Sequence, residues 1–151
     1  MSPAMPADFV YRRRVQFAET DMAGVMHFSN YLRLMEECEH AFWRSLGLSV
    51  HACPTADGPL ISWPRVVVRC EYFAPARFED DLDLAFRIDR LGNRSMEFSV
   101  MFSCGGRRLA TASATTVCCR LNGERFEPVE IPADIRARLS GLVADRPTSG
   151  E

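Results

Sequence analysis

The sequence predicts an α+β fold in which an antiparallel sheet packs against one long helix. One segment carries apolar residues at helical spacing, whereas several others alternate apolar and polar residues as strands do. The order along the chain is a strand, the long helix and then about four strands, without the repeated strand–helix–strand units of a parallel sheet. A doubly wound parallel sheet is therefore disfavoured.

The first predicted strand begins at Phe9 and ends near Phe17. Its apolar residues alternate, and Arg13 interrupts the pattern. Because the neighbouring arginines Arg12 and Arg14 would point to the other face of a strand, the three are expected to be solvated edge charges and not one patch.

The long helix is predicted over about residues 29–46. Its apolar residues recur on one helical face: Tyr31, Leu34, Met35, Cys38, Ala41, Phe42 and Leu46. Ser29 or Asn30 is the expected N-cap, and Gly47 stands where a glycine commonly ends a helix. Glu36 is expected to be solvated or at a dimer contact, and His40 to be at the surface.

The remaining strands follow in antiparallel order. Turn residues at 92–93, 105–106 and 122–123 separate the expected strands 66–72, 82–88, 96–103 and 109–121. Alanines at 110, 112 and 114 place small side chains on one face of the last strand, where a helix could pack closely. A short helix over 132–142 is expected to cover an edge or end of the sheet.

Length and charge indicate one domain without nucleic acid as its main partner. The 151 residues are enough for one core, expected over residues 9–145 with loose ends at 1–8 and 146–151. The net charge is −2, which argues against nucleic-acid binding. No apolar run is long enough to span a membrane, so no membrane partner is expected.

Residue usage excludes several chemistries. The chain has no lysine, so Schiff-base catalysis and a P-loop are excluded. It has six cysteines, but no C-x-x-C pair, no H-E-x-x-H motif and no secretory signal at the start. We therefore expect reduced thiols, a cytoplasmic location and no metal site.

The segment between the first strand and the helix combines a carboxylate with a helix start. Asp21 lies a few residues before the predicted helix, whose first N–H groups are free to stabilise a negatively charged oxygen. His51 has no partner in this segment and is expected at the surface. The segment reads Phe17-Ala18-Glu19-Thr20-Asp21-Met22-Ala23-Gly24-Val25-Met26-His27-Phe28-Ser29-Asn30-Tyr31.

This segment, with Leu32 and Glu36, resembles the signature of hotdog-fold acyl-CoA thioesterases of the 4-hydroxybenzoyl-CoA thioesterase type. The strand–helix–meander order agrees with that family over about residues 9–130. The resemblance implies a hotdog fold, in which a five-stranded antiparallel sheet wraps around the long helix. It also implies a homodimer or homotetramer with the active site at the dimer interface.

The resemblance assigns roles residue by residue. Asp21 matches the catalytic carboxylate, as a nucleophile on the thioester carbonyl or as a general base for water. The Phe28 backbone N–H matches the donor that polarises the carbonyl oxygen, and Gly24 matches the loop glycine beside the thioester. His27 either orients the thioester or water, or caps the helix. Glu19 stands where many relatives have aspartate and receives no role.

The expected function is therefore an acyl-CoA thioesterase that hydrolyses an acyl or aroyl thioester to a free acid and coenzyme A. No cofactor is expected, because coenzyme A is part of the substrate and a thiolate leaves readily. With lysine absent, arginines, backbone N–H groups or solvent are expected to hold its phosphates. A thioesterase acting on acyl carrier protein and a non-catalytic acyl-thioester binding module stay open as alternatives.

Overall fold

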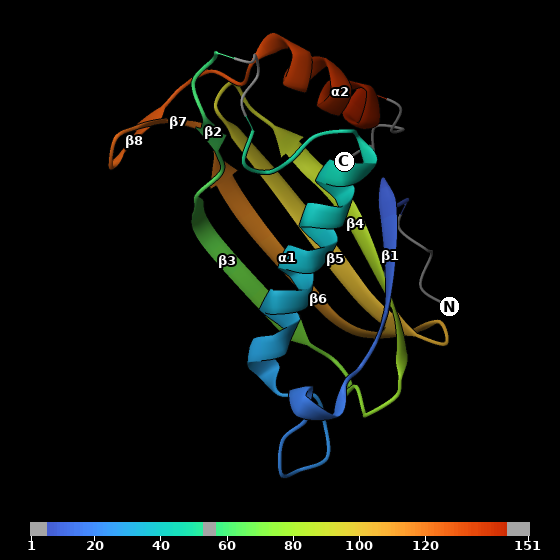
Figure 1. Ribbon diagram of the computed structural model, residues 1–151. Helices are drawn as coiled ribbons and strands as arrows, with labels where there is room; N and C mark the ends of the chain where they lie inside the picture. The colour runs from blue at the N-terminus through green and yellow to red at the C-terminus, as the bar shows by residue number, and fades with distance from the viewer. Residues whose placement is uncertain (1–5, 53–56, 145–151) are drawn as a thin grey trace.

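A computed structural model describes residues 6–52 and 57–144 of the chain, and one long helix lies across one face of a five-stranded antiparallel sheet (Figure 1). The helix is α1 (Phe28–Ser45). The sheet has the strand order β1 (Phe9–Arg14), β4 (Asp81–Leu91), β5 (Ser95–Cys104), β6 (Arg107–Val117) and β3 (Arg65–Tyr72). The predicted α+β class and five-stranded sheet are confirmed.

Helix α1 follows its predicted face but begins earlier than expected. The apolar stripe from Tyr31 to Trp43 is buried against the sheet. The N-cap is His27, not Ser29 or Asn30, because the His27 side chain accepts a hydrogen bond from the Ser29 N–H while its own backbone is extended. Gly47 has φ +70°, as predicted for a glycine that ends a helix.

The sheet meets the helix through small side chains on β6. Ala110, Ala112 and Ala114 are buried, and they lie opposite aromatic and β-branched residues of β5 in the register. Helix α1 lies near β6, which agrees with the expectation that a helix could pack over its small side chains.

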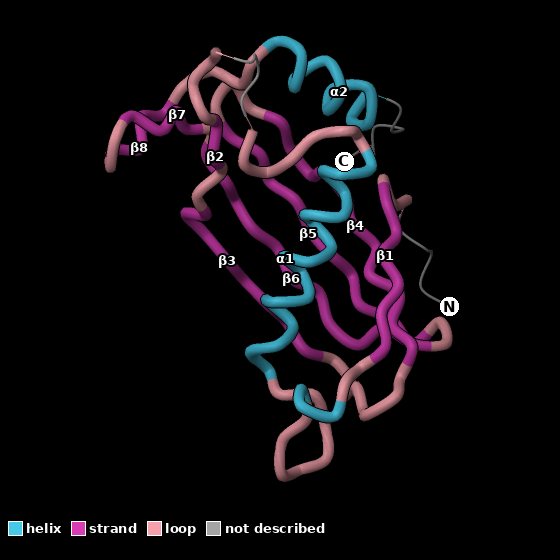
Figure 2. The backbone as a smooth tube through the Cα atoms, viewed as in Figure 1, coloured by secondary structure: helices cyan, strands magenta, loops and turns pink. Residues whose placement is uncertain are grey.

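The last predicted strand, 109–121, is wrong in one respect: it is two strands. β6 ends at Val117, and β7 (Cys119–Asn122) then pairs with β2 (Ile61–Ser62) and β8 (Arg125–Pro128) in a separate three-stranded sheet (Figure 2). The break falls at Cys118, whose N–H bonds to the Arg94 carbonyl and whose side chain is buried. Alternation alone gave no signal for this change of sheet.

The second helix and the loop with the predicted chemistry lie at opposite ends of the sheet. Helix α2 (Ala133–Ala144) buries Ile135 and Leu139 and packs near β4, as expected for a helix that covers an end of the sheet. The loop that precedes α1 projects beyond the other end (Figure 1). Most of the two predicted loose ends lies outside the described residues.

Candidate active site

The loop between β1 and α1 folds back on itself and carries Asp21. Thr20 and Met26 form an isolated antiparallel bridge, the Asp21 N–H donates to the Val25 carbonyl at 2.9 Å, and the Gly24 N–H donates to the Asp21 carbonyl at 3.0 Å. Gly24 has φ +74°, and a Cβ there would touch nothing within 4 Å. Within the described chain, glycine is therefore required at position 24 by the backbone conformation and not by lack of space.

The Asp21 carboxylate is exposed at the outer part of this loop. Its Oδ1 accepts a hydrogen bond from the Ala23 N–H at 2.8 Å, which fixes the side chain against its own turn. Within the described residues, no arginine or histidine pairs with it. One oxygen thus faces solvent and is accessible to a ligand.

The helix start supplies a free donor next to this loop. Phe28 is the first residue of α1, so its N–H has no partner within the helix, and it donates no hydrogen bond to the rest of the described chain. His27 caps the helix: its Nδ1 lies 2.7 Å from Ser29 Oγ, and its ring packs on Phe28 at 4.5 Å between centroids. The capping alternative for His27 is therefore observed.

An open groove of about 330 Å³ lies between the helix start and the segment that follows β3. It is lined by aromatic and small apolar residues: Val25, Met26, Phe28, Tyr31, Tyr72, Phe73, Ala74 and Pro75. The Tyr72 hydroxyl donates to the Phe28 carbonyl at 3.0 Å, which ties the far wall to the helix start. The carbonyl of Val25, a residue of the groove wall, accepts a hydrogen bond from the Asp21 N–H, so the backbone of Asp21 adjoins this wall. By contrast, Phe42, Trp43 and Trp63 are core residues.

Three exposed arginines border this groove. Arg108 stacks over the Phe73 ring at 3.8 Å, Arg107 reaches the Pro75 carbonyl at 3.4 Å, and Arg77 reaches the Gly24 carbonyl at 3.5 Å. None of the three forms an ion pair with a carboxylate in the part of the chain that the structure describes. Their positions depend on contacts between distant segments, so these three arginines could not be selected from the sequence alone.

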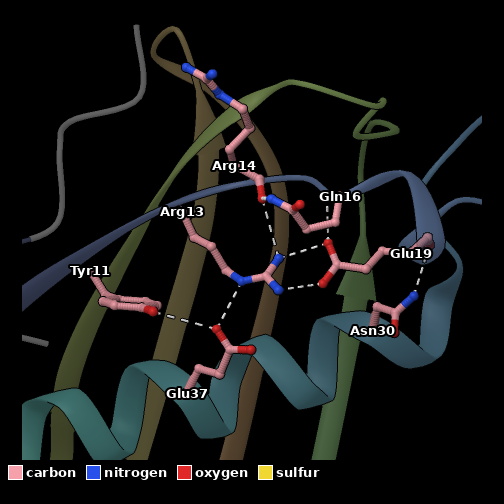
Figure 3. Close-up of polar contacts among 7 residues, drawn as sticks. All are labelled: Tyr11, Arg13, Arg14, Gln16, Glu19, Asn30 and Glu37. Carbon is pink, nitrogen blue, oxygen red and sulfur yellow. Dashed lines mark hydrogen bonds and ion pairs between the residues drawn. The ribbon is translucent and has the colours of Figure 1, made fainter.

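Glu19, which received no role, is held at the base of the loop. Arg13 binds both of its carboxylate oxygens and also binds Glu37 of α1 at 2.9 Å (Figure 3). Arg12 and Arg14 instead pair with Asp83 and Asp81 at the exposed side of β1. The expectation of solvated edge charges is thus confirmed for Arg12 and Arg14 and wrong for Arg13, because its side chain turns toward the helix.

A buried carboxylate, that of Glu39, was missed by sequence reasoning. It is fully buried on α1 and pairs with Arg65 at the start of β3, while its Oε1 has no hydrogen-bond partner in the described chain. Burial raises the pKa of the Glu39 carboxyl to about 7, against the opposing effect of the Arg65 charge. Its position, eight residues after Tyr31, lies on the apolar stripe of the helix and could have indicated burial.

The other titratable residues singled out in the sequence lie away from the groove. Glu36 is exposed and reaches Arg65 at 3.6 Å, and His51 is exposed as expected. His40 is half-buried and not at the surface, and burial lowers its pKa.

The described cysteines are free thiols; Cys53 lies outside the described residues. In the described part of the chain, neither helix has the length and apolar character needed to cross a membrane.

Comparisons with known proteins agree with this architecture. Residues 15–139 match the model of the Thioesterase-like superfamily. A protein of Aquifex aeolicus is 31% identical over 128 residues, covering 84% of this chain and 94% of the relative. The 1,4-dihydroxy-2-naphthoyl-CoA hydrolase of Thermosynechococcus vestitus is 27% identical over 123 residues, covering 81% of this chain and 83% of the relative.

A solved structure, that of a gentisyl-coenzyme A thioesterase, superposes with a TM-score of 0.73 at 28% identity, covering 87% of this chain and 99% of that one. The family match, over residues 15–139, includes the loop before α1, α1 itself and strands β3 to β6. The chain therefore belongs to the Thioesterase-like superfamily, and it is a hotdog-fold enzyme of the thioester-hydrolase type.

Proposed function

We propose that the chain hydrolyses acyl-CoA thioesters, with Asp21 as the catalytic carboxylate and the Phe28 N–H as the donor to the carbonyl oxygen. The observation that carries this proposal is the arrangement at the foot of α1. The unpaired N–H of Phe28 lies at an open apolar groove, and the accessible carboxylate of Asp21 lies on the loop whose residues Val25 and Met26 form part of the groove wall. Coenzyme A enters as part of the substrate, and the reaction requires no resident cofactor.

The chemistry needs only these few groups. As the thioester carbonyl is attacked, negative charge develops on its oxygen, and an N–H at the positive end of a helix stabilises that charge. Asp21 either attacks the carbonyl carbon or removes a proton from water. The leaving thiolate has a conjugate thiol with a pKa of about 8.5 and so does not need a strong general acid. His27 Nδ1 is engaged by Ser29, so His27 contributes through the position of the helix start.

The lining of the groove favours an aromatic acyl group. Phe28, Tyr31, Tyr72 and Phe73 offer ring faces and edges to a flat substrate, and aromatic pairs contribute about 0.5–1.5 kcal/mol beyond burial. Two of the similar proteins are named for aromatic acyl-CoA substrates, naphthoyl and gentisyl. An aroyl-CoA is therefore the first substrate class to try.

Arg77, Arg107 and Arg108 are suited to bind the phosphates of coenzyme A. They are exposed and carry no carboxylate partner among the described residues; Arg107 and Arg108 contact the groove wall, and Arg77 contacts Gly24 in the adjoining loop. The guanidinium group binds phosphate through paired N–H donors, which suits a chain without lysine. The apolar groove would then hold the acyl end, with the phosphates at its mouth.

A homodimer would complete the groove. β3 is an edge strand that pairs only with β6 within the described chain, and it exposes three consecutive valines, Val66, Val67 and Val68. The charged residues of β3, which are Arg65, Arg69 and Glu71, lie outside this run of valines, so the run itself has no charge or proline to keep another strand away. We expect two copies to pair through β3, next to the groove wall at Tyr72, and sedimentation velocity should give twice the monomer mass.

Reduced cysteines and a coenzyme A substrate support a cytoplasmic location.

The test is thiol release from a panel of aroyl-CoA, aliphatic acyl-CoA and acyl-carrier-protein thioesters. We expect turnover, fastest with an aroyl-CoA. Preference for the carrier-bound acyl group would favour the carrier-protein alternative. Binding of a non-hydrolysable aroyl-CoA without turnover of any thioester would favour the binding module and reject the enzymatic proposal.

The phosphate assignment is tested with Arg108→Met. KM should rise about tenfold or more for an aroyl-CoA, because charge-assisted bonds to phosphate are lost. KM for the same aroyl group on N-acetylcysteamine, which has no phosphate, should stay unchanged. An equal rise for both substrates would contradict the assignment. Arg125, an exposed arginine next to the far β7–β8 turn, provides the matched control as Arg125→Met.

A further inference from the structure

Arg13 and Glu19 form a two-point ion pair at the base of the loop that carries Asp21 (Figure 3). Arg13 Nη2 lies 2.5 Å from Glu19 Oε1, and Nη1 lies 2.7 Å from Oε2. The Gln16 backbone N–H donates to the same Oε2 at 2.8 Å. The side chains of Arg13 and Glu19 are only 20% and 15% exposed. Parallel N–H···O bonds of this kind are both strong and directional.

The backbone of Glu19 joins the two ends of the loop. Its carbonyl oxygen accepts the His27 N–H at 2.8 Å and the Asn30 side-chain amide at 2.8 Å. Asp21 follows Glu19 by two residues, and Phe28 follows His27 directly. Glu19 therefore holds both the backbone segment that carries Asp21 and the helix start that presents the Phe28 N–H.

Arg13 extends this connection to the body of the helix. Its Nε lies 2.9 Å from Glu37 Oε2 on α1, and the Tyr11 hydroxyl donates to the same oxygen at 3.5 Å. A single guanidinium thus joins β1, the short 3₁₀ turn Phe17–Glu19 and α1. Rotation of the loop base against the helix would break several of these bonds together.

We propose that Arg13 and Glu19 are positioning residues that hold Asp21 in register with the Phe28 N–H. Neither side chain reaches the groove, so both act through the backbone of the loop. This positioning role rests on the proposed function, because the reaction that it serves is the proposed hydrolysis of an acyl-CoA thioester. A displacement of about 1 Å between reacting groups can slow a reaction about 100-fold, so a mispositioned loop should lower turnover while substrate still binds.

The charges of this pair are kept at neutral pH. Burial acts to raise the pKa of Glu19, but the hydrogen bonds from Arg13 and from the Gln16 N–H, with the Arg13 charge, outweigh it and lower the pKa. The stabilisation from this carboxylate is present above its ordinary pKa and is lost as the pH falls through the lowered value. The ion pair between Arg13 and Glu19 is therefore intact at neutral pH.

The test compares Glu19→Gln and Glu19→Asp with a matched control. Glu19→Gln removes the charge and keeps the size, so kcat should fall about tenfold or more while KM for an aroyl-CoA changes less than about twofold. Glu19→Asp restores the charge and should recover most of the lost kcat. The control is Asp81→Asn, which removes the exposed partner of Arg14 on the neighbouring strand and should leave kcat unchanged.

Hydrogen exchange separates positioning from the reaction itself. The His27 amide, which bonds to the Glu19 carbonyl, should exchange at least about tenfold faster in Glu19→Gln, since local opening sets its protection. Wild-type kcat in folded Glu19→Gln, or unchanged exchange at His27, would overturn the proposal. If the wild-type chain hydrolyses no thioester, the proposed function fails while the exchange measurement still decides whether Glu19 holds the loop.

Discussion

Two arginine–glutamate pairs flank helix α1, and they differ in how completely the carboxylate is satisfied. Glu19 retains slight solvent exposure and receives three hydrogen bonds from Arg13 and Gln16. Glu39 is fully buried, pairs with Arg65 and leaves Oε1 without a partner in the described chain. The pKa is lowered at Glu19 and raised to about 7 at Glu39.

The difference shows that an adjacent arginine does not by itself determine the charge state of a carboxylate. Desolvation acts against the charged form at both sites: it prevails at the fully buried Glu39, whereas the bonds from Arg13 and the Gln16 N–H outweigh it at the partly exposed Glu19. The pair with more donors lies beside the candidate site, where it fixes the loop. The pair with fewer donors lies against the core, where its protonation is coupled to folding.

Arg13→Met should produce the largest effect. It leaves the mostly buried Glu19 without its ion-pair partner, and removing one member of a buried pair costs about 3–4 kcal/mol in the free energy of unfolding. Denaturant unfolding at pH 7 measures this loss. Arg14→Met, in the exposed pair with Asp81 on the same strand, is the matched control and should change stability little. Equal losses in the free energy of unfolding for Arg13→Met and Arg14→Met would contradict the claim that the mostly buried pair contributes more to stability than the exposed one.

Glu39→Gln should show a smaller effect on stability, and this effect should depend on pH. Because the pKa of Glu39 is raised, the folded state binds more protons than the unfolded state between about pH 4.5 and 7. Wild-type stability relative to Glu39→Gln should therefore decrease as the pH rises through this window, by at most about 3 kcal/mol. Unfolding of both proteins at pH 5 and pH 7.5 measures it. A constant difference across this range would mean that the pKa of Glu39 is not raised.

The sequence predicted the elements that depend on local patterns. Helix α1, the strands of the main sheet and the turn at Asn122–Gly123 follow from periodicity and turn residues. The loop motif located Asp21, Gly24, His27 and Phe28 in one short segment, and the structure brings that segment to the edge of a groove.

The contacts that the sequence did not reveal are long-range. Arg13 meets Glu37 across 24 positions (37 − 13), and Arg65 meets Glu39 across 26 (65 − 39), so no local pattern encodes either pair. The arginines beside the groove come together only when β3, β6 and their loops are assembled. The break at Cys118 depends likewise on the Arg94 carbonyl in another turn.

The most direct measurement of the central claim is single-turnover thiol release by Asp21→Asn with an aroyl-CoA that the wild type hydrolyses. The asparagine keeps the size of the side chain and an oxygen for the Ala23 N–H but removes the carboxylate. The rate should fall by about 10²–10⁴-fold, while the Kd for a non-hydrolysable analogue changes less than about threefold. A wild-type rate in Asp21→Asn would contradict the assignment of Asp21 as the catalytic carboxylate.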